Sequence, residues 1–215
     1  MLRQVQIDFV SDVSCPWCVV GLRSLEAALA GLEGEIAGDI HFQPFELNPD
    51  LGPEGESVIE HLTRKYGSTP EQLARNQEAI RARGAELGFV FDMSKRARVY
   101  NTFDAHRLMH WAEGTGRQKA LKEALFTAYF TEGRNPGDHG VLEELAAQAG
   151  LDRERARQIL TSTEYAAEVR EREQLYLRKG IHAVPSVILN RRYLLQGGQP
   201  SEVFERALRQ AAASP

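Results

Sequence analysis

The residues best suited to chemistry are the chain's only two cysteines, Cys15 and Cys18, which are separated by Pro16 and Trp17. A thiolate is the reactive form of cysteine, and the positive end of a helix dipole stabilises it. Pro16 suits the first turn of a helix, where its missing N–H costs no hydrogen bond. We therefore expect Cys15 to be the exposed, ionised thiol at a helix N-terminus. Cys18, one turn further, is expected to be more buried and to displace the product of thiol–disulfide exchange.

The same two cysteines also allow a structural interpretation. A disulfide across two intervening residues closes a very short loop, so it would stabilise the fold little through chain entropy. A zinc site needs two further ligands, which His106 and His110 could supply from one turn of a predicted helix. These histidines share a half-buried face with Val99 and Phe103, which favours packing or hydrogen bonding instead. Four other histidines stand alone and are expected at the surface: His41, His61, His139 and His182.

Composition excludes several classes of partner. Lys and Arg number 26 against 30 Asp and Glu, interspersed along the chain, so no basic stripe predicts a nucleic-acid partner. The longest apolar runs, such as 184–189, are far too short to cross a membrane. The first ten residues are interrupted by Gln4, Gln6 and Asp8, so they lack the apolar core of a signal peptide. We therefore predict a cytoplasmic protein, although a mature chain after signal removal would look similar.

The elements predicted around the cysteines form an α/β pattern. Val5–Val10 is expected to be a strand, a helix begins at Pro16, and Ile40–Leu47 alternates as a second strand. Helical periodicity then extends to about residue 163, in segments near 54–66, 70–87, 96–113, 117–131, 138–149 and 152–161. The pattern is completed by a helix at 164–179, short strands at 184–189 and 192–196 and a last helix from Pro200.

The order of these elements predicts one interrupted domain. The two ends of the chain read as halves of a single α/β domain, with the helical segments inserted between them. Residues 120–130 are apolar nearly all round, so we expect this segment at the centre of the helical block.

Motifs spread along the chain carry a family resemblance. They are the stretches 8–18 with Gly21, 44–50, 101–108, 125–133, 180–189 and 197–200. Together they resemble the DsbA-like thioredoxin-fold proteins, specifically the FrnE-type dithiol–disulfide isomerase branch. The resemblance covers essentially the whole chain and implies a thioredoxin fold with an inserted all-helical domain. On this basis residues 1–52 and 164–215 form the discontinuous thioredoxin-like domain, and residues 53–163 form the insertion.

The resemblance also implies roles for single residues. Cys15 is expected to be the nucleophile and Cys18 the resolving thiol. Pro185 matches a proline that follows a cis peptide bond and faces the cysteines, where the neighbouring backbone can pair with an extended substrate. The residues expected to support the active site are Pro16, Trp17, Val184 and Pro185.

The function predicted is that of a dithiol–disulfide oxidoreductase or isomerase that uses no metal or organic cofactor. Its expected partners are protein or small-molecule disulfides and dithiols, with a cellular reductant such as glutathione or thioredoxin. Kappa-type glutathione transferases and 2-hydroxychromene-2-carboxylate isomerases are the main alternative, because they have the same architecture. They typically place Ser where Cys15 stands, so the presence of both cysteines argues against them. A zinc-stabilised interaction module is the third hypothesis.

Overall fold

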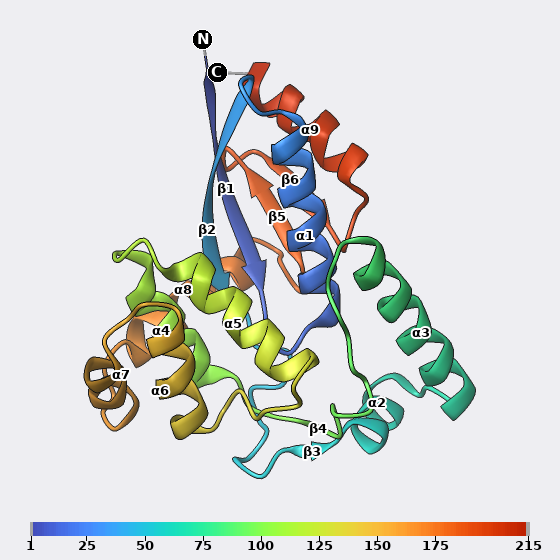
Figure 1. Cartoon of the computed structure of the whole chain (residues 1–215), viewed down its shortest axis with the longest axis vertical. Helices are drawn as coiled ribbons and strands as arrows, with labels where there is room; N and C mark the ends of the chain where they lie inside the picture. The colour runs from blue at the N-terminus through green and yellow to red at the C-terminus, as the bar shows by residue number, and fades with distance from the viewer. Residues whose placement is uncertain (1, 214–215) are drawn as a thin grey trace.

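A mixed β-sheet lies at one end of the molecule. The structure, a computed structural model, describes residues 2–213; Met1, Ser214 and Pro215, which the predicted thioredoxin-like domain includes, lie outside this range. Within it, four strands are ordered β2-β1-β5-β6 (Figure 1). They are β1 (Arg3–Ser11), β2 (Ile36–Pro44), β5 (Ser186–Leu189) and β6 (Tyr193–Gln196). β2 is parallel to β1, β5 is antiparallel to β1, and β6 is antiparallel to β5.

Two helices pack beside this sheet and beside each other, α1 (Pro16–Gly31) and α9 (Ser201–Ala213) (Figure 1). The helix predicted from Pro16 is confirmed, and its apolar residues at helical spacing, among them Val19, Leu22 and Leu25, are buried. After α1 the chain turns at Gly34, whose φ of +82° is readily adopted only by glycine, and then enters β2.

The helices predicted between the sheet halves are confirmed. They are α2 (Val58–Tyr66), α3 (Pro70–Glu86), α4 (Phe103–Glu113), α5 (Gln118–Phe130), α6 (His139–Gln148) and α7 (Arg153–Leu160), followed by α8 (Ala166–Arg178). Local sequence fixes several starts. Thr69 and Gln72 form a capping box before α3, and the side chains of Asp138 and Asp152 cap α6 and α7. In the part of the chain that the structure describes, no helix has both the length and the apolar character needed to cross a membrane.

Two short strands interrupt the helical block, β3 (Glu56–Ser57) and β4 (Arg98–Val99). They pair antiparallel, where the periodicity predicts only helix. Gly55, at a φ of +63°, lies so close to β4 that a Cβ there would be 2.2 Å from the carbonyl oxygen of Val99. β3 and β4 are about 40 residues apart in the sequence, and each is a strand only because it pairs with the other. Local periodicity therefore cannot predict them.

β2 also differs from its predicted range of 40–47. It begins at Ile36, since its pairing with β1 starts opposite Arg3, and it ends at Pro44, which cannot donate to a further strand partner. Beyond Pro44 the chain leaves the sheet, and the backbone N–H of Leu47 donates to the carboxylate of Asp12 (2.7 Å).

One cluster of buried apolar side chains extends through the sheet, α1 and the helical block. The segment predicted at its centre is helix α5, which buries Leu121, Leu125, Phe126 and Phe130 together with the side chain of Lys122. The predicted division into residues 1–52 with 164–215 and residues 53–163 stays a prediction, because apolar contacts are continuous across it.

Candidate active site

Cys15 is the N-cap residue of α1, and Cys18 lies in the first turn of the same helix. Both are free thiols and they lie 3.3 Å apart. The Sγ of Cys15 donates a hydrogen bond to the carbonyl oxygen of Val184 (3.6 Å). The sequence predicts an exposed Cys15, and this is wrong, because only 4% of its surface is exposed. Side chains from α2 and α3 line a cavity over it and shield it from bulk solvent.

The segment that faces Cys15 contains the predicted proline. The Val184–Pro185 peptide bond is cis, as the resemblance implies. Gly21 of α1 lies against the ring of Pro185, and a Cβ at Gly21 would be only 3.0 Å from its Cγ. A larger residue at position 21 would therefore push the Val184–Pro185 segment away from the cysteines.

Trp17 stands half-buried between the two cysteines. Its ring packs on the backbone of Gly198, where a Cβ would be 3.2 Å from the tryptophan Cε3 atom. The other side of Trp17 borders the cavity, together with Pro16 and Val184. These three residues, predicted as active-site support, are therefore brought together around Cys15.

Cys18 is fully buried, whereas Cys15 borders the cavity. Burial raises the pKa of the Cys18 thiol well above its ordinary value, and its hydrogen bond with Cys15 raises it further. The ammonium of Lys122 acts in the opposite direction and lowers the pKa of Cys18. Cys18 is thus held as a protonated thiol, with one cation near enough to favour its thiolate.

Lys122 lies in α5 and is 1% exposed, which is unusual for a lysine. Its Nζ lies 4.9 Å from the ring centroid of Phe126 and 5.9 Å from that of Phe42. Burial lowers the pKa of Lys122 from 10.5 to about 8, although interactions with Cys18, when it is ionised, and with the Asp12 carboxylate act against the shift. This lysine can therefore exist in both protonation states close to neutral pH.

Asp12 lies in the turn between β1 and Cys15. Its carboxylate accepts hydrogen bonds from the backbone N–H (3.0 Å) and the hydroxyl (2.9 Å) of Ser14 and from the N–H of Leu47. The Nε2 atom of His106 lies 3.6 Å from Asp12 Oδ1, with both side chains buried. Burial raises the pKa of Asp12, but His106 and the two backbone donors outweigh it and lower the pKa to about 2. Asp12 thus stays ionised and fixes the turn that carries Cys15.

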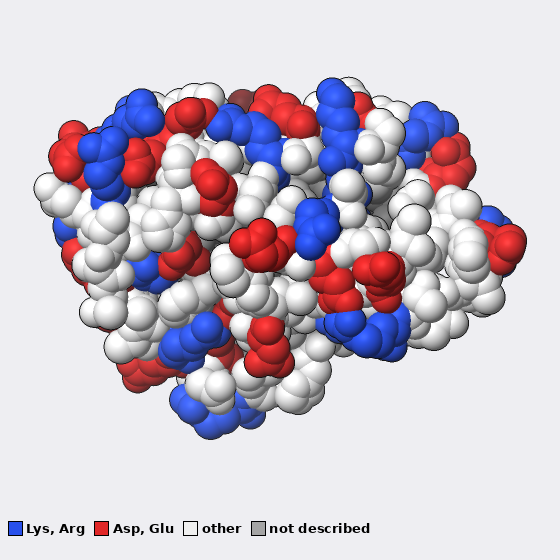
Figure 2. All heavy atoms as spheres, turned by 90° about the horizontal axis from the view of Figure 1, so that it is seen from below, with Lys and Arg blue, Asp and Glu red and all other residues white. Residues whose placement is uncertain are grey.

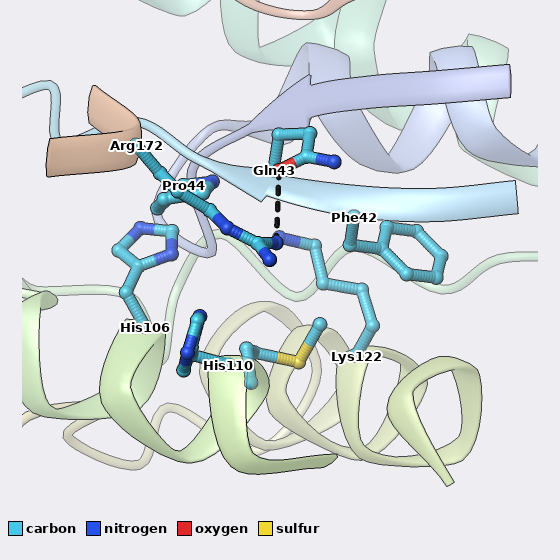
Figure 3. A pocket seen from close by; sticks show the side chains of 8 residues that line it. Phe42, Gln43, Pro44, His106, His110, Lys122 and Arg172 are labelled. Atoms are coloured by element: carbon cyan, nitrogen blue, oxygen red, sulfur yellow. Dashed lines mark hydrogen bonds between the residues drawn. The ribbon is translucent and has the colours of Figure 1, made fainter. Parts of the chain in front are cut away.

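His106 and His110 project from α4 toward β2, beside Lys122 and Arg172 (Figure 3). The ring of His110 lies 5.2 Å from that of Tyr165, and burial together with the charge of Arg172 lowers the pKa of His110. The packing positions predicted for these histidines agree with those contacts, but the buried His106 Nε2 and His110 Nδ1 atoms have no hydrogen-bond partner within the described residues. Among residues 2–213, no group of three or more His, Cys, Asp or Glu side chains is arranged around a common metal position.

The other histidines divide into two groups. His139 and His182 are exposed and His41 is half-buried. His61 is only 6% exposed, so the surface position predicted for it is wrong. Its Nδ1 atom lies 2.9 Å from the carboxylate of Glu56 in β3, and this strand is the element that periodicity does not predict.

The cavity beside Cys15 has a volume of about 340 Å³. The thioredoxin-like part contributes residues 14–17, 47–48 and Val184, and α2 and α3 contribute the opposite wall. Tyr66, at the end of α2, is 60% exposed. Its partial burial raises the pKa of its hydroxyl, and the charge of Cys15 raises it to a smaller extent. The cavity is thus bounded by Cys15 on one side and by α2 and α3 on the other.

Sequence reasoning missed Asp12, Lys122 and the cavity residues from α2 and α3. Lys122 had a usable signal, since it is a lysine in a segment that is otherwise apolar nearly all round. Asp12 had a weaker one, because it lies three residues before Cys15 in a predicted turn. The α2–α3 wall had none, since it depends on long-range packing.

Comparison with known proteins gives consistent matches. A family model of the DSBA-like thioredoxin domain matches residues 6–209. A probable DsbA oxidoreductase from Streptomyces coelicolor, known from its crystal structure, is 36% identical with a TM-score of 0.91, covering 98% of this chain and 91% of that chain. YwbO of Bacillus subtilis (strain 168) is 27% identical over 205 residues, which are 95% of this chain and 96% of that protein.

A more distant match shows the fold alone. The cytosolic disulfide reductase DsbM from Pseudomonas aeruginosa, solved with GSH, is 20% identical with a TM-score of 0.64. The match covers 95% of this chain and 98% of that chain.

Proposed function

The chain belongs to the DSBA-like thioredoxin domain family, a family of thiol oxidoreductases, and from this we propose that it exchanges disulfides through Cys15 and Cys18. The predicted DsbA-like resemblance and the predicted thioredoxin-like fold with many helices are both confirmed by these matches. The observation that carries the proposal is the position of the two free thiols. Cys15 caps α1 at the edge of a cavity, and Cys18 lies 3.3 Å from it in the buried interior.

The proposed reaction has two displacements. The Cys15 thiolate attacks one sulfur of a substrate disulfide, which breaks that S–S bond, forms a mixed disulfide and releases the first thiolate. The Cys18 thiolate then attacks Cys15 Sγ, forms the Cys15–Cys18 disulfide and releases the second thiolate. Two electrons pass from the dithiol to the substrate, and the two thiol protons end on the two products. This chemistry needs no metal or organic cofactor, because the dithiol itself carries the electrons.

The second displacement requires a deprotonated Cys18. Burial opposes that deprotonation, and Lys122 is the nearby cation that favours it. Since the pKa of Lys122 is lowered to about 8, we assign to its neutral form the role of accepting the proton from Cys18, and the ammonium so formed then stabilises the Cys18 thiolate. Asp12 and His106 play a positioning part, because they hold the turn that precedes Cys15.

Finer assignments also belong to this proposal. We place the chain in the FrnE-type isomerase branch and in the cytoplasm, with a reductant such as glutathione or thioredoxin. Support comes from the motifs shared with that branch and, for the cytoplasmic reductant, from the fold likeness to DsbM. Val184 is proposed to offer its backbone to a bound substrate, because its carbonyl oxygen already accepts from the Sγ of Cys15.

Trapping tests the two cysteine roles. Cys18→Ser should accumulate a mixed disulfide on Cys15, detectable as an added mass that a strong reductant removes. Cys15→Ser should trap nothing and should lose all insulin reduction. Equal trapping by both variants would contradict the assignment of roles. Glutathione conjugation that survives Cys15→Ser would favour the transferase alternative instead.

A further inference from the structure

The cavity beside Cys15 has a charge opposite in sign to that of the whole chain. The chain has more acidic than basic residues, 30 against 26, and on the face seen in Figure 2 the two signs are intermixed. Of the described residues that line the cavity, two are basic, Lys65 and Arg96, and none is Asp or Glu. The space that opens onto the nucleophile is therefore electropositive.

Lys65, in the last turn of α2, is positioned without a carboxylate partner among residues 2–213. Its Nζ donates to the carbonyl oxygen of Leu47 (2.6 Å) and to Oδ1 of Asn48 (2.9 Å), which are both neutral. Partial burial lowers the pKa of Lys65, and the charge of the Asp12 carboxylate, which is buried and already bonded to Ser14 and Leu47, acts in the opposite direction. Within the described residues Lys65 thus has no ion-pair partner, and its ammonium is available to an anionic ligand.

Arg96, the second basic residue of the cavity, contacts the residue that precedes Cys15. Its Nε donates to the hydroxyl of Tyr129 (3.0 Å), and its Nη2 reaches the carbonyl oxygen of Ser14 (3.5 Å), next to Cys15. Its Cζ atom lies 5.2 Å from the ring centroid of Tyr129 and 5.3 Å from that of Phe130. These contacts fix the guanidinium in a half-buried position, and in the described range none of them is to a carboxylate.

We infer that this cavity binds a small disulfide that carries carboxylate groups, with Lys65 and Arg96 holding the negative charge beside Cys15. The inference rests on the proposed exchange through Cys15 and specifies its substrate class. A volume of about 340 Å³ suits a small molecule, since such sites typically measure roughly 300–1,000 Å³. A folded protein fits less well, because the α2–α3 wall and the 4% exposure of Cys15 restrict access to the sulfur.

Three small disulfides of different charge test the inference. The full-length reduced chain is mixed with dithiodipropionate, which carries two carboxylates, with uncharged hydroxyethyl disulfide, or with cystamine, which carries two ammonium groups. Each rate is divided by the rate of the same disulfide with dithiothreitol, an uncharged dithiol, to remove intrinsic reactivity. The normalised rate for dithiodipropionate should exceed that for cystamine by about tenfold or more, because an electropositive cleft concentrates anions.

Single substitutions locate the charge. Lys65→Gln and Arg96→Gln should each reduce the dithiodipropionate-to-cystamine ratio at least about threefold, because each removes one cation from the cavity. Lys65 is exposed on α2, so Lys65→Gln should fold normally. The test therefore holds even if Arg96→Gln disturbs folding. Lys119→Gln is the matched control. It removes one positive charge from α5, where Lys119 pairs with Glu26 outside the cavity, and it should leave the ratio unchanged.

The outcomes separate the inference from the proposed function. Equal normalised rates for the three disulfides would overturn the anionic substrate and leave the exchange activity in place. A charge preference that survives in both cavity variants would overturn the assignment of Lys65 and Arg96. A normalised rate for insulin above that for dithiodipropionate would overturn the small substrate. Loss of exchange with every disulfide would overturn the inference and the proposed function together.

Discussion

The side of the cysteine pair in front of Cys15 differs from the side behind Cys18, although both sulfurs take part in the same proposed reaction. In front of Cys15, Lys65 borders an open cavity and is held by neutral oxygens. Behind Cys18, Lys122 is buried against aromatic rings with its pKa lowered to about 8. An exposed ammonium stays charged and can exchange its solvent contacts for a ligand, whereas a buried one changes its protonation state more readily. Position alone thus gives two lysines different uses, one in substrate selection and the other in proton transfer.

The largest expected effect comes from removing the buried charge. Lys122→Met should slow the second displacement by about tenfold or more, because each unit rise in the pKa of Cys18 removes nine-tenths of its thiolate. The mixed disulfide formed with hydroxyethyl disulfide should therefore persist, and quenching by alkylation followed by mass spectrometry measures its decay. Lys119→Met, on the exposed face of the same helix, is the control. Unchanged decay in Lys122→Met would show that the proton goes elsewhere.

The same substitution should stabilise the fold. The pKa of Lys122 is lower in the folded chain than in the unfolded chain, so between about pH 8 and 10.5 the unfolded state binds more protons; below about pH 8 the lysine is charged in both states, and the full cost of burying that charge destabilises the fold. A shift from 10.5 to about 8 corresponds to about 3 kcal/mol, which Lys122→Met should recover at neutral pH. The gain should shrink as the pH rises from 8 toward 10.5. Urea unfolding across this range measures it, and a constant gain would contradict the buried ammonium.

Asp12 gives the next largest effect, with the opposite dependence on pH. Its pKa is depressed from 3.8 to about 2, so its stabilising contribution is present above pH 3.8 and is lost as the pH falls toward 2. Asp12→Asn should lower the free energy of unfolding by about 2 kcal/mol at neutral pH and by progressively less in acid. Asp39→Asn, at a side chain that is 67% exposed, is the control and should change little. Equal losses at neutral and acid pH would mean that the carboxylate charge is not what stabilises the turn.

The features around the two cysteines also differ in how far the sequence could predict them. Cys15, Pro16 and the helix that follows are encoded within one stretch of chain, so the helix and the position of Cys15 at its start were predictable. The burial of Cys15 was not, because the covering residues of α2 and α3 are about 50 residues away in sequence. Lys122 is an intermediate case. The apolar pattern predicts that its helix lies at the centre of the helical block, but it does not predict that Lys122 lies near Cys18.

A smaller effect is expected at position 17, which lies between the two sides. Trp17 presents an apolar ring and one indole N–H, so it offers no charge to a thiolate. Trp17→His should stabilise the reduced dithiol through an added donor and a possible cation. The couple should become more oxidising by about 30 mV, which is 1.4 kcal/mol for two electrons. Equilibration with glutathione buffers, read by thiol alkylation, measures the potential. An unchanged potential would mean that residue 17 does not set it.

The smallest effect separates the two lysines without any mutation. Salt screens exposed charges strongly, since the Debye length falls from about 10 Å at 0.1 M to about 3 Å at 1 M, but it screens buried charges much less. Raising the salt should therefore lower the rate of the first displacement on dithiodipropionate a few-fold, because Lys65 acts through solvent. The rate of the second displacement should stay nearly constant, because the interaction of Lys122 with Cys18 lies in the buried interior. Stopped-flow measurement of both steps in one reaction gives the comparison directly. If both rates fell together, the buried lysine would not act on the second step as we propose, and the distinction between the two sides would fail.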